Sequence, residues 1–330
     1  MRNRTQHKCS YVTVSLVTMS VLLSDLLTQS PSHIPRLYYF PDASKPRTSQ
    51  KAWASKYPEI LPPALQFSYD PSIDEINKQL GPEDEMDRFL LSKVVHPLNQ
   101  TEEALQSEGD SRRVFYTQIA LPVQLGLQEI IELRSESGPP GSTSCPQTAD
   151  FLWMRDDQSV IMGEFKRHGI IEPATWMGRK TADTNQRFLG KELRGYCEKY
   201  KTPAAALFDG QHLLLLVFKA EKLEAIKHED CPVLGFMFPY SSATLRYCLF
   251  RVTSQQIRRC QTQKSEGNLE LGGYTRHFEW WSGAPYWKDA ANNIFPHHPS
   301  GRIARCFNPE NGEWYWDIRP GRVIDTVTLW

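Results

Sequence analysis

The chain has 330 residues, of which 40% are hydrophobic, so it is long enough to bury one or two hydrophobic cores. Lysine plus arginine and aspartate plus glutamate both number 38, and this balance excludes the strongly charged compositions typical of general nucleic-acid or membrane-surface binders. Seven cysteines are scattered without a CxxC pair, which argues against a disulfide framework and favours free thiols in a reducing compartment.

The first 27 residues allow two interpretations. A basic start, MRNRTQHK, precedes a moderately apolar run at 11–27, a pattern typical of a signal peptide or a weak membrane anchor. The run is rich in Ser and Thr and contains Asp25, which favours a helix or strand packed on a soluble domain. We therefore expect an intracellular protein, in the nucleus or the cytoplasm, without a membrane partner. Secretion, with a role as an effector-like interaction protein, is the alternative.

Residues 1–111 are expected to form an N-terminal arm. Residues 28–66 are dense in Pro and Ser, a composition that favours irregular or extended structure. The charged stretch 72–110 has short helical patterns broken by Gly81, Pro82 and Pro97, which predict peripheral helices.

The main domain is expected at residues 112–219. Apolar residues near helical spacing between Ile119 and Ile131 predict a long helix, kinked or restarted at Pro122. The segments TADFLWMR (148–155) and VIMGEFKR (160–167) flank a short polar connection and predict a β-hairpin. A helix that begins near Thr184 or Asn185 follows, and two apolar strands around Asp209–Gly210 predict a second hairpin. The predicted order is helix, strand, strand, helix, strand, strand.

Residues 220–330 are expected to complete or flank that domain. They contain a predicted helix at 253–261 and alternating strand segments around Pro320–Gly321. Six of the nine tryptophans follow residue 279. Because basic residues are not regularly interleaved with them, core packing is favoured over stacking on nucleic-acid bases.

Two residues of the first hairpin, Glu164 and Lys166, point to the same face of their strand, because side chains alternate. Asp150, on the preceding strand, comes near Glu164 only if the hairpin is bent or bulged. Two carboxylates and a lysine on neighbouring strands suit a Mg²⁺ site, because Mg²⁺ prefers oxygen ligands. An ion held there could promote hydrolysis of a phosphodiester. The alternative is a solvated salt bridge on an edge strand.

The D…ExK hairpin, the helix carrying Gln186 and the strands around ALFDGQHLLLLVF together resemble the core of the PD-(D/E)XK nuclease-like superfamily. The similarity covers about residues 112–219 and is greatest to divergent domains expanded in fungal genomes. It implies an α/β (α+β) fold with a restriction-endonuclease-like core, in which helices flank a mixed four-stranded sheet. It also implies hydrolysis of DNA, or occasionally RNA, with Mg²⁺ or alternatively Mn²⁺.

The resemblance further implies a role for individual residues. Asp150 corresponds to the metal-binding aspartate, Glu164 to the second acid and Lys166 to the lysine of the ExK element. Gln186 corresponds to a polar helix residue that assists the site, with Asn185 and Lys191 as alternatives. The first helix has arginines where many members carry an acid, so a catalytically inactive module that binds nucleic acid or protein is a second hypothesis.

Basic residues are locally in excess around this hairpin and the following helix, with nine basic and five acidic residues between 164 and 201. We predict contacts with phosphates for four of them, namely Arg167, Arg187, Lys191 and Arg194. A solvated helix face is the alternative.

Other chemistry has little support in the sequence. His297, His298 and Cys306, or His228 with Cys231, lack a second well-spaced pair for zinc. The absence of GxSxG, Walker A and GxGxxG sequences argues against the common hydrolase and nucleotide sites, so no small-molecule cofactor is expected. No pattern indicates an oligomeric state.

Overall fold

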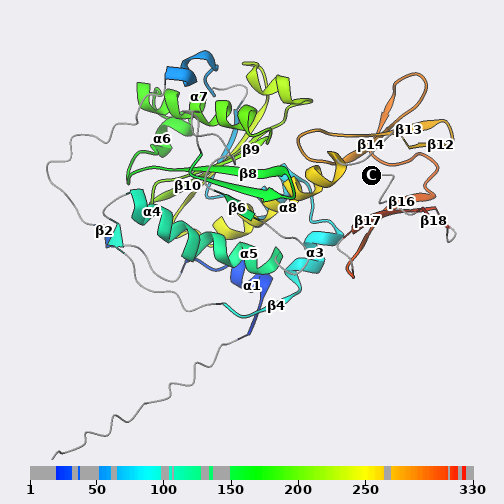
Figure 1. Ribbon diagram of the computed structural model, residues 1–330, viewed down its shortest axis with the longest axis horizontal. Helices are drawn as coiled ribbons and strands as arrows, with labels where there is room; N and C mark the ends of the chain where they lie inside the picture. Colours follow the sequence, from blue (N-terminus) through cyan, green and yellow to red (C-terminus); the bar gives the residue numbers. More distant parts are fainter. Residues whose placement is uncertain are drawn as a thin grey trace, which may run out of the picture.

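The computed structural model describes residues 20–31, 36–37, 52–60, 65–97, 104–105, 108–127, 134–136, 149–263, 269–310, 313–318 and 322–324. The largest sheet within these ranges has seven strands, in the spatial order β3-β11-β10-β9-β8-β7-β6 (Figure 1). In chain order they are β3 (Leu65–Tyr69), β6 (Arg134–Glu136), β7 (Phe151–Arg155), β8 (Gln158–Phe165), β9 (Ala204–Phe208), β10 (His212–Phe218) and β11 (Val233–Pro239). β9 is parallel to β8 and β3 to β11, whereas the other neighbours are antiparallel.

The four strands predicted from the sequence are β7 to β10, and they are consecutive neighbours in the sheet. The mixed α and β class is confirmed, but the expected sheet was too small. β11, with the apolar sequence VLGFMFP, pairs with β10, and β3 pairs with β11. The third added strand, β6, pairs with β7 inside 112–219, but β3 and β11 come from segments outside it, so the core extends beyond the expected domain boundaries.

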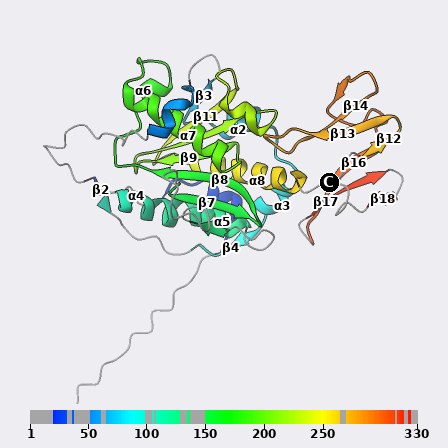
Figure 2. The same ribbon diagram turned by 45° about the horizontal axis from the view of Figure 1, so that its top comes forward.

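Helices cover both faces of the sheet and make it the middle of three layers (Figures 1 and 2). One face packs against α7 (Thr184–Lys199), with α6 (Pro173–Trp176), η1 (Ala52–Lys56) and η3 (Leu223–Lys227) around it. The other face packs against α1 (Leu23–Leu27), α4 (Glu108–Val114), η2 (Phe115–Ala120), α5 (Leu121–Leu127) and α8 (Leu245–Gln263). Because side chains alternate, β10 buries Leu213 and Leu215 on the second face and Leu214 and Leu216 on the first.

Helix α7 begins at a different cap from the one expected. Its N-cap is Asp183, whose carboxylate accepts a hydrogen bond from the backbone N–H of Gln186 at 2.9 Å. Thr184 and Asn185, the predicted caps, are the first two helical residues. An aspartate here also places negative charge at the positive end of the helix dipole.

The helical run from 108 to 127 passes through Pro122, with the π-helical turn η2 immediately before it. Proline lacks the N–H that would bond to the carbonyl four residues earlier, which belongs to Gln118. That carbonyl accepts a hydrogen bond from Arg246 Nε of α8 at 2.7 Å instead. The expected kink or restart is therefore a local widening of the helix, supported by a buried arginine.

Part of the N-terminal arm belongs to the core, so the prediction of peripheral helices is wrong. Helices α2 (Ile73–Leu80) and α3 (Glu85–Leu91) bury side chains in the same cluster as α5 and α8, among them Ile76, Met86 and Leu90. Each helix begins with a capping box, at Ser72 and Asp84 respectively.

Residues 20–27, the part of the first 27 residues that the structure describes, also pack on the domain. Helix α1 buries Leu23, Leu26 and Leu27 in the core, as the second interpretation of this segment expects, and residues 1–19 lie outside the described residues. Short strand pairs β1 (Val21–Leu22) with β4 (Val94–Val95), and β2 (Arg36–Leu37) with β5 (Ala104–Leu105), complete the arm. In the part of the chain that the structure describes, no helix is both long and apolar enough to cross a bilayer.

The C-terminal region has two parts. α8 and β11 complete the core, and residues beyond 269 form two small antiparallel sheets next to the end of α8 (Figure 2). One sheet contains β12 (Glu270–Leu271), β13 (Tyr274–Phe278), β14 (Pro285–Lys288) and β15 (Ile294–Phe295), and the other contains β16 (Ile303–Asn308), β17 (Glu313–Ile318) and β18 (Arg322–Ile324). Trp287, Trp314 and Trp316 are buried, which confirms the core-packing interpretation for these three.

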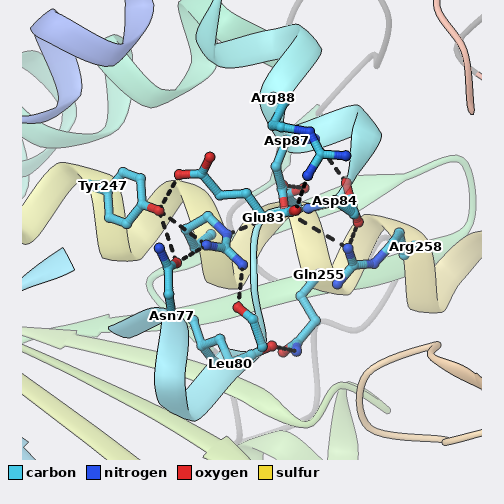
Figure 3. A network of polar contacts seen from close by, with 12 residues as sticks. Asn77, Leu80, Glu83, Asp84, Asp87, Arg88, Tyr247, Gln255 and Arg258 are labelled. Atoms are coloured by element: carbon cyan, nitrogen blue, oxygen red, sulfur yellow. Dashed lines mark hydrogen bonds and ion pairs between the residues drawn. The ribbon is translucent and has the colours of Figure 1, made fainter. Parts of the chain in front are cut away.

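A buried polar network fixes α2 and α3 to α8 (Figure 3). Arg251 Nε of α8 lies 3.3 Å from a carboxylate oxygen of Asp87 on α3, and one of its terminal nitrogens donates to the Gly81 carbonyl at 2.8 Å. Tyr247 donates to Glu83 at 2.5 Å. Burial raises the pKa of Asp87, whereas the neighbouring Arg251 lowers it.

Removal of Arg251 should destabilise the protein strongly, because it takes from the buried Asp87 carboxylate its nearest cationic partner. We expect Arg251→Met to lower the free energy of unfolding by about 3 kcal/mol or more, measured by urea denaturation. Lys227→Met is the matched control, since Lys227 pairs with Glu198 on the surface, and it should cost less than about 1 kcal/mol. Equal costs for the two variants would contradict a central role for the network.

Candidate functional site

The hairpin that carries the ExK sequence contains one extra residue. Next to its two-residue turn, β7 and β8 pair regularly, with Arg155 opposite Gln158. Val160 then has no partner, and the pairing resumes shifted by one position. After this β-bulge the pairing runs to Phe151 opposite Gly163, so Asp150 and Glu164 are the next residues on the two sides of the hairpin.

Asp150 lies at the open end of the hairpin with its carboxylate held in place. Its backbone N–H donates to the Gly163 carbonyl at 3.0 Å, and its Oδ2 accepts from the Phe165 N–H at 2.7 Å. Strand alternation places the Asp150 and Glu164 side chains on the face that α7 covers. The condition derived from the sequence, a bulged hairpin, is met.

Gly163 is required by the aromatic packing on the opposite face. A Cβ at this position would lie 1.7 Å from the Phe151 ring. Phe151 stacks on Phe115 with 5.0 Å between ring centroids, and its ring lies 5.5 Å from that of Phe165. Phe208 adds a fourth ring, 5.7 Å from Phe115. Four packed rings, from η2, β7, β8 and β9, therefore support the strand pair that carries Asp150 and Glu164.

Glu164, Lys166 and Glu192 form a buried group of three charges. Lys166 Nζ lies 2.8 Å from Glu164 Oε1 and 3.5 Å from Glu192 Oε2. The three residues are 4%, 7% and 3% exposed, respectively. A solvated salt bridge on an edge strand, the alternative interpretation of the ExK sequence, is therefore wrong, because β8 is an inner strand and the charges are buried.

Glu192 was not among the predicted site residues. It lies on α7, three residues after Leu189 and four before Tyr196, and both neighbours belong to the buried face of the helix. A carboxylate within an apolar helical stripe is the signal that could have identified it. Its pairing with Lys166 offsets the cost of burying its charge.

Gln186 holds the segment that follows β8. Its Oε1 accepts from Trp176 Nε1 at 2.8 Å and from the Glu172 N–H at 3.2 Å, and its Nε2 donates to the Ile170 carbonyl at 2.6 Å. These contacts engage both ends of the amide. Gln186 therefore supports residues 170–176, whereas Lys166 contacts the carboxylates of Glu164 and Glu192.

Asp209, directly after β9, is a second support for this segment. The residue is fully buried, and its Oδ2 accepts from the Ile171 N–H at 2.9 Å. Its Oδ1 accepts from the N–H groups of Gln211 and His212, at 3.0 and 2.8 Å, which closes the predicted hairpin between β9 and β10. Burial raises the pKa of the Asp209 carboxyl, and the three N–H donors lower it.

The predicted phosphate-binding residues do not share one surface. Arg194 is fully buried, and its guanidinium donates to the carbonyls of Glu59, Ile226 and His228. Its assignment to a phosphate is therefore wrong, because it cannot reach solvent. Arg187 and Lys191 lie 3.9 and 3.4 Å from the Glu59 carboxylate, while Arg167 is exposed at the end of β8.

Over the described ranges, no group of three or more His, Cys, Asp or Glu side chains is placed to hold a metal ion. His298, considered above for zinc, has its ring nitrogens 2.8 Å from Ser300 Oγ and 3.0 Å from the Leu271 carbonyl. No family model, no curated protein and no solved structure matches the chain. A functional assignment therefore depends on the geometry around Glu164 and Lys166.

His212, beside Asp209, should make the protein less stable in acid. Burial lowers the pKa of its imidazole, the neighbouring His168 lowers it further, and Asp209 opposes both. Because the folded-state pKa lies below the ordinary value of 6.5, the unfolded chain binds the proton first, and stability falls as the pH falls through 6.5. His212→Asn should reduce this loss, measured as the urea midpoint above and below pH 6.5.

The exposed His96 provides the control for this measurement. His96→Asn should leave the pH dependence of the urea midpoint as it is in the native chain. An equal pH dependence in His212→Asn and the native protein would contradict the role given to His212.

Proposed function

We propose that the chain is a nuclease-like enzyme that hydrolyses phosphodiester bonds of nucleic acid with Mg²⁺. The observation that carries this proposal is that Asp150 and Glu164 both lie next to the last hairpin pair, Phe151 with Gly163, with Lys166 Nζ 2.8 Å from Glu164 Oε1. The order helix, hairpin, helix, hairpin, formed by the run from α4 to α5, β7–β8, α7 and β9–β10, supports a restriction-endonuclease-like core of the PD-(D/E)XK type.

The oxygen ligands at this position suit a hard divalent cation. Mg²⁺ is commonly held by one or two carboxylates and keeps several water ligands, so Asp150 and Glu164 would be sufficient, with Mn²⁺ as the alternative. When bound, the ion would activate a water molecule and offset negative charge on the phosphate. Hydrogen bonds from the Phe165 N–H and from Lys166 fix the direction of the two carboxylates.

Lys166 would act on the phosphate through its ammonium group. A fixed ammonium can donate a hydrogen bond to a phosphate oxygen and stabilise the charge that grows there during hydrolysis. Glu192, 3.5 Å from Nζ on α7, would keep the ammonium between the sheet and the helix. We therefore assign Glu192 as a positioning residue for Lys166.

DNA is the expected substrate, with RNA as the alternative. Arg167, exposed immediately after Lys166, would bind a phosphate next to the one that is cleaved. Such a local contact agrees with a chain whose acidic and basic residues are equal in number. It also implies that binding weakens as the salt concentration rises.

A module that binds nucleic acid without cleaving it is the second candidate. Lys166 lies between Glu164 and Glu192, and its positive charge already offsets the negative charge of these carboxylates without a metal ion. The first helix also carries Arg112 and Arg113 where many enzymes of the resembling superfamily carry an acid.

Cleavage of plasmid DNA, single-stranded DNA and RNA in Mg²⁺ or Mn²⁺ tests the proposal. We expect the native chain to cut, and Asp150→Asn and Lys166→Met to lower the rate by about a hundredfold or more, as for other groups that stabilise transition-state charge. Asp157→Asn is the matched control, because Asp157 is exposed in the turn of the same hairpin. It should cut at the native rate.

Three results would count against the proposal. Equal cleavage by the native chain and Asp150→Asn would place the activity elsewhere. Binding of nucleic acid without cleavage by any variant would favour the second candidate. Neither binding nor cleavage would exclude both candidates. Thermal unfolding of each variant separates loss of activity from loss of the fold.

A further inference from the structure

The buried charges raise the question of how a substrate reaches them. Glu164 and Lys166 are almost fully buried, so a phosphodiester within a nucleic-acid chain cannot contact them unless a neighbouring part of the protein moves. The chain that follows Lys166 continues into residues 170–177, which include α6. Ile170, Ile171 and Trp176 pack in the same cluster as the α7 face of the sheet. Figures 1 and 2 show α6 beside α7, at one end of the sheet.

Polar contacts join residues 170–177 to α7 and to the sheet at two points, and a third set joins the segment to Arg179 and Lys180, which follow it after Gly178. On the helix side, Gln186 bonds to the Ile170 carbonyl, the Glu172 N–H and Trp176 Nε1. On the sheet side, Asp209 accepts from the Ile171 N–H. The β8–β9 pairing places Asp209 next to Lys166, since the Lys166 N–H donates to the carbonyl of the residue before Asp209.

The segment also has hydrogen bonds of its own. Thr175 Oγ1 donates to the Glu172 carboxylate at 2.8 Å, and the N–H of Met177 donates to the Pro173 carbonyl at 2.9 Å. The Gly178 N–H donates to the Thr175 carbonyl at 3.0 Å. These bonds would be kept if the segment moved as a unit, so opening does not require it to unfold.

A glycine in the left-handed region stands at each end of the segment. Gly169 has φ 75° and Gly178 has φ 70°, and no atom lies within 4 Å of a Cβ built at either position. Glycine samples alternative backbone conformations more freely than other residues. The Gly169 end can therefore change conformation without losing side-chain packing. At the other end, the Ala174 carbonyl accepts from the N–H groups of Arg179 and Lys180, at 2.8 and 3.1 Å, so residues 178–180 would move with the segment.

We propose that residues 170–177 are a lid, closed in this structure, that covers the Glu164, Lys166 and Glu192 group and opens by breaking the contacts of Gln186 and Asp209. Its purpose, admission of a phosphodiester to Lys166, rests on the proposed function. Its opening does not, because opening requires neither nucleic acid nor a cation.

Native-state hydrogen exchange of the full chain in low urea tests the lid without any substrate. The Ile171 and Glu172 amides, which are bonded to Asp209 and Gln186, should exchange through a local opening whose rate is independent of urea. The amides of Leu214 and Leu215 in the inner strand β10 should exchange more slowly and accelerate with urea. Equal rates and equal urea dependence at the two places would show that the segment opens only with the whole fold, which would overturn the lid.

Gln186→Leu removes the helix-side attachment while keeping an apolar side chain of similar size. We expect exchange within 170–177 to rise at least about tenfold, because several hydrogen bonds are lost and each is typically worth a few-fold in an opening equilibrium. Labelling of Lys166 by an amine-reactive reagent, followed by mass spectrometry, should rise with it. The matched control is Gln256→Leu on α8, which removes a bond from another buried glutamine to the Trp281 carbonyl. It should leave exchange of 170–177 unchanged.

Trp176→Phe gives a milder version of the test if Gln186→Leu fails to fold. It keeps an aromatic ring in the core but removes the Nε1 donor to Gln186 and part of the ring volume, so exchange within 170–177 should rise a few-fold. Unchanged Lys166 labelling in a folded Gln186→Leu or Trp176→Phe variant would overturn the lid.

The results also separate the lid from the nuclease. Local opening in a protein that cleaves no nucleic acid would support the lid and contradict the proposed nuclease activity. Cleavage by a protein in which the amides of residues 170–177 exchange only through global unfolding would support the nuclease activity and contradict the lid.

Discussion

The extra residue in β8 determines which side chains meet at the end of the β7–β8 hairpin. Without Val160 in the bulge, Asp150 would stand opposite Gly163, and Glu164 would face a different residue. The same shift brings the Phe151 ring over Gly163, where any other side chain would collide with it. A slip of one residue would thus disturb the aromatic cluster on one face and separate the carboxylates on the other. The packing of an apolar ring therefore fixes the register on which the candidate chemistry depends.

Two groups of buried charges in this domain have different consequences. Arg251 and Asp87 join the N-terminal helices to α8 and have a structural role. Lys166 lies between acids from β8 and α7, at the end of the sheet where the chain turns into residues 170–177. Burial holds the second group in one arrangement, which is the preorganisation that the proposed electrostatic catalysis would need. The same burial blocks access, so the proposed site would require a part that can move.

Much of the core could be predicted from the sequence, because the relevant signals are local. Alternation, the short polar connection at 156–159 and the Asp209–Gly210 turn predicted both hairpins and their order. The membership of β3 in the sheet could not be predicted, since its partner β11 lies more than 160 residues further along the chain. Helical periodicity gave the faces of α7, but it could not show that Arg194 is covered by the chain around Glu59.

The candidate site was predictable in composition but not in geometry. Asp150, Glu164 and Lys166 could be identified from residue type and strand alternation, whereas their proximity depends on a bulge that no hydrophobic pattern specifies. The position of Gln186 was predicted, but its role follows from contacts with a segment that has no regular pattern. Glu192 lies within the apolar stripe of α7, but its pairing with Lys166 depends on how the helix packs on the sheet, which periodicity does not give.

The most direct test of the account is divalent-cation binding, measured by calorimetry with Mn²⁺ and Mg²⁺ on the native chain, Asp150→Asn and Asp157→Asn. If Asp150 and Glu164 share a cation across the bulged hairpin, the native chain and Asp157→Asn will bind the ion and Asp150→Asn will lose it. Binding that survives in Asp150→Asn, or no binding in the native chain, would contradict the proposed centre.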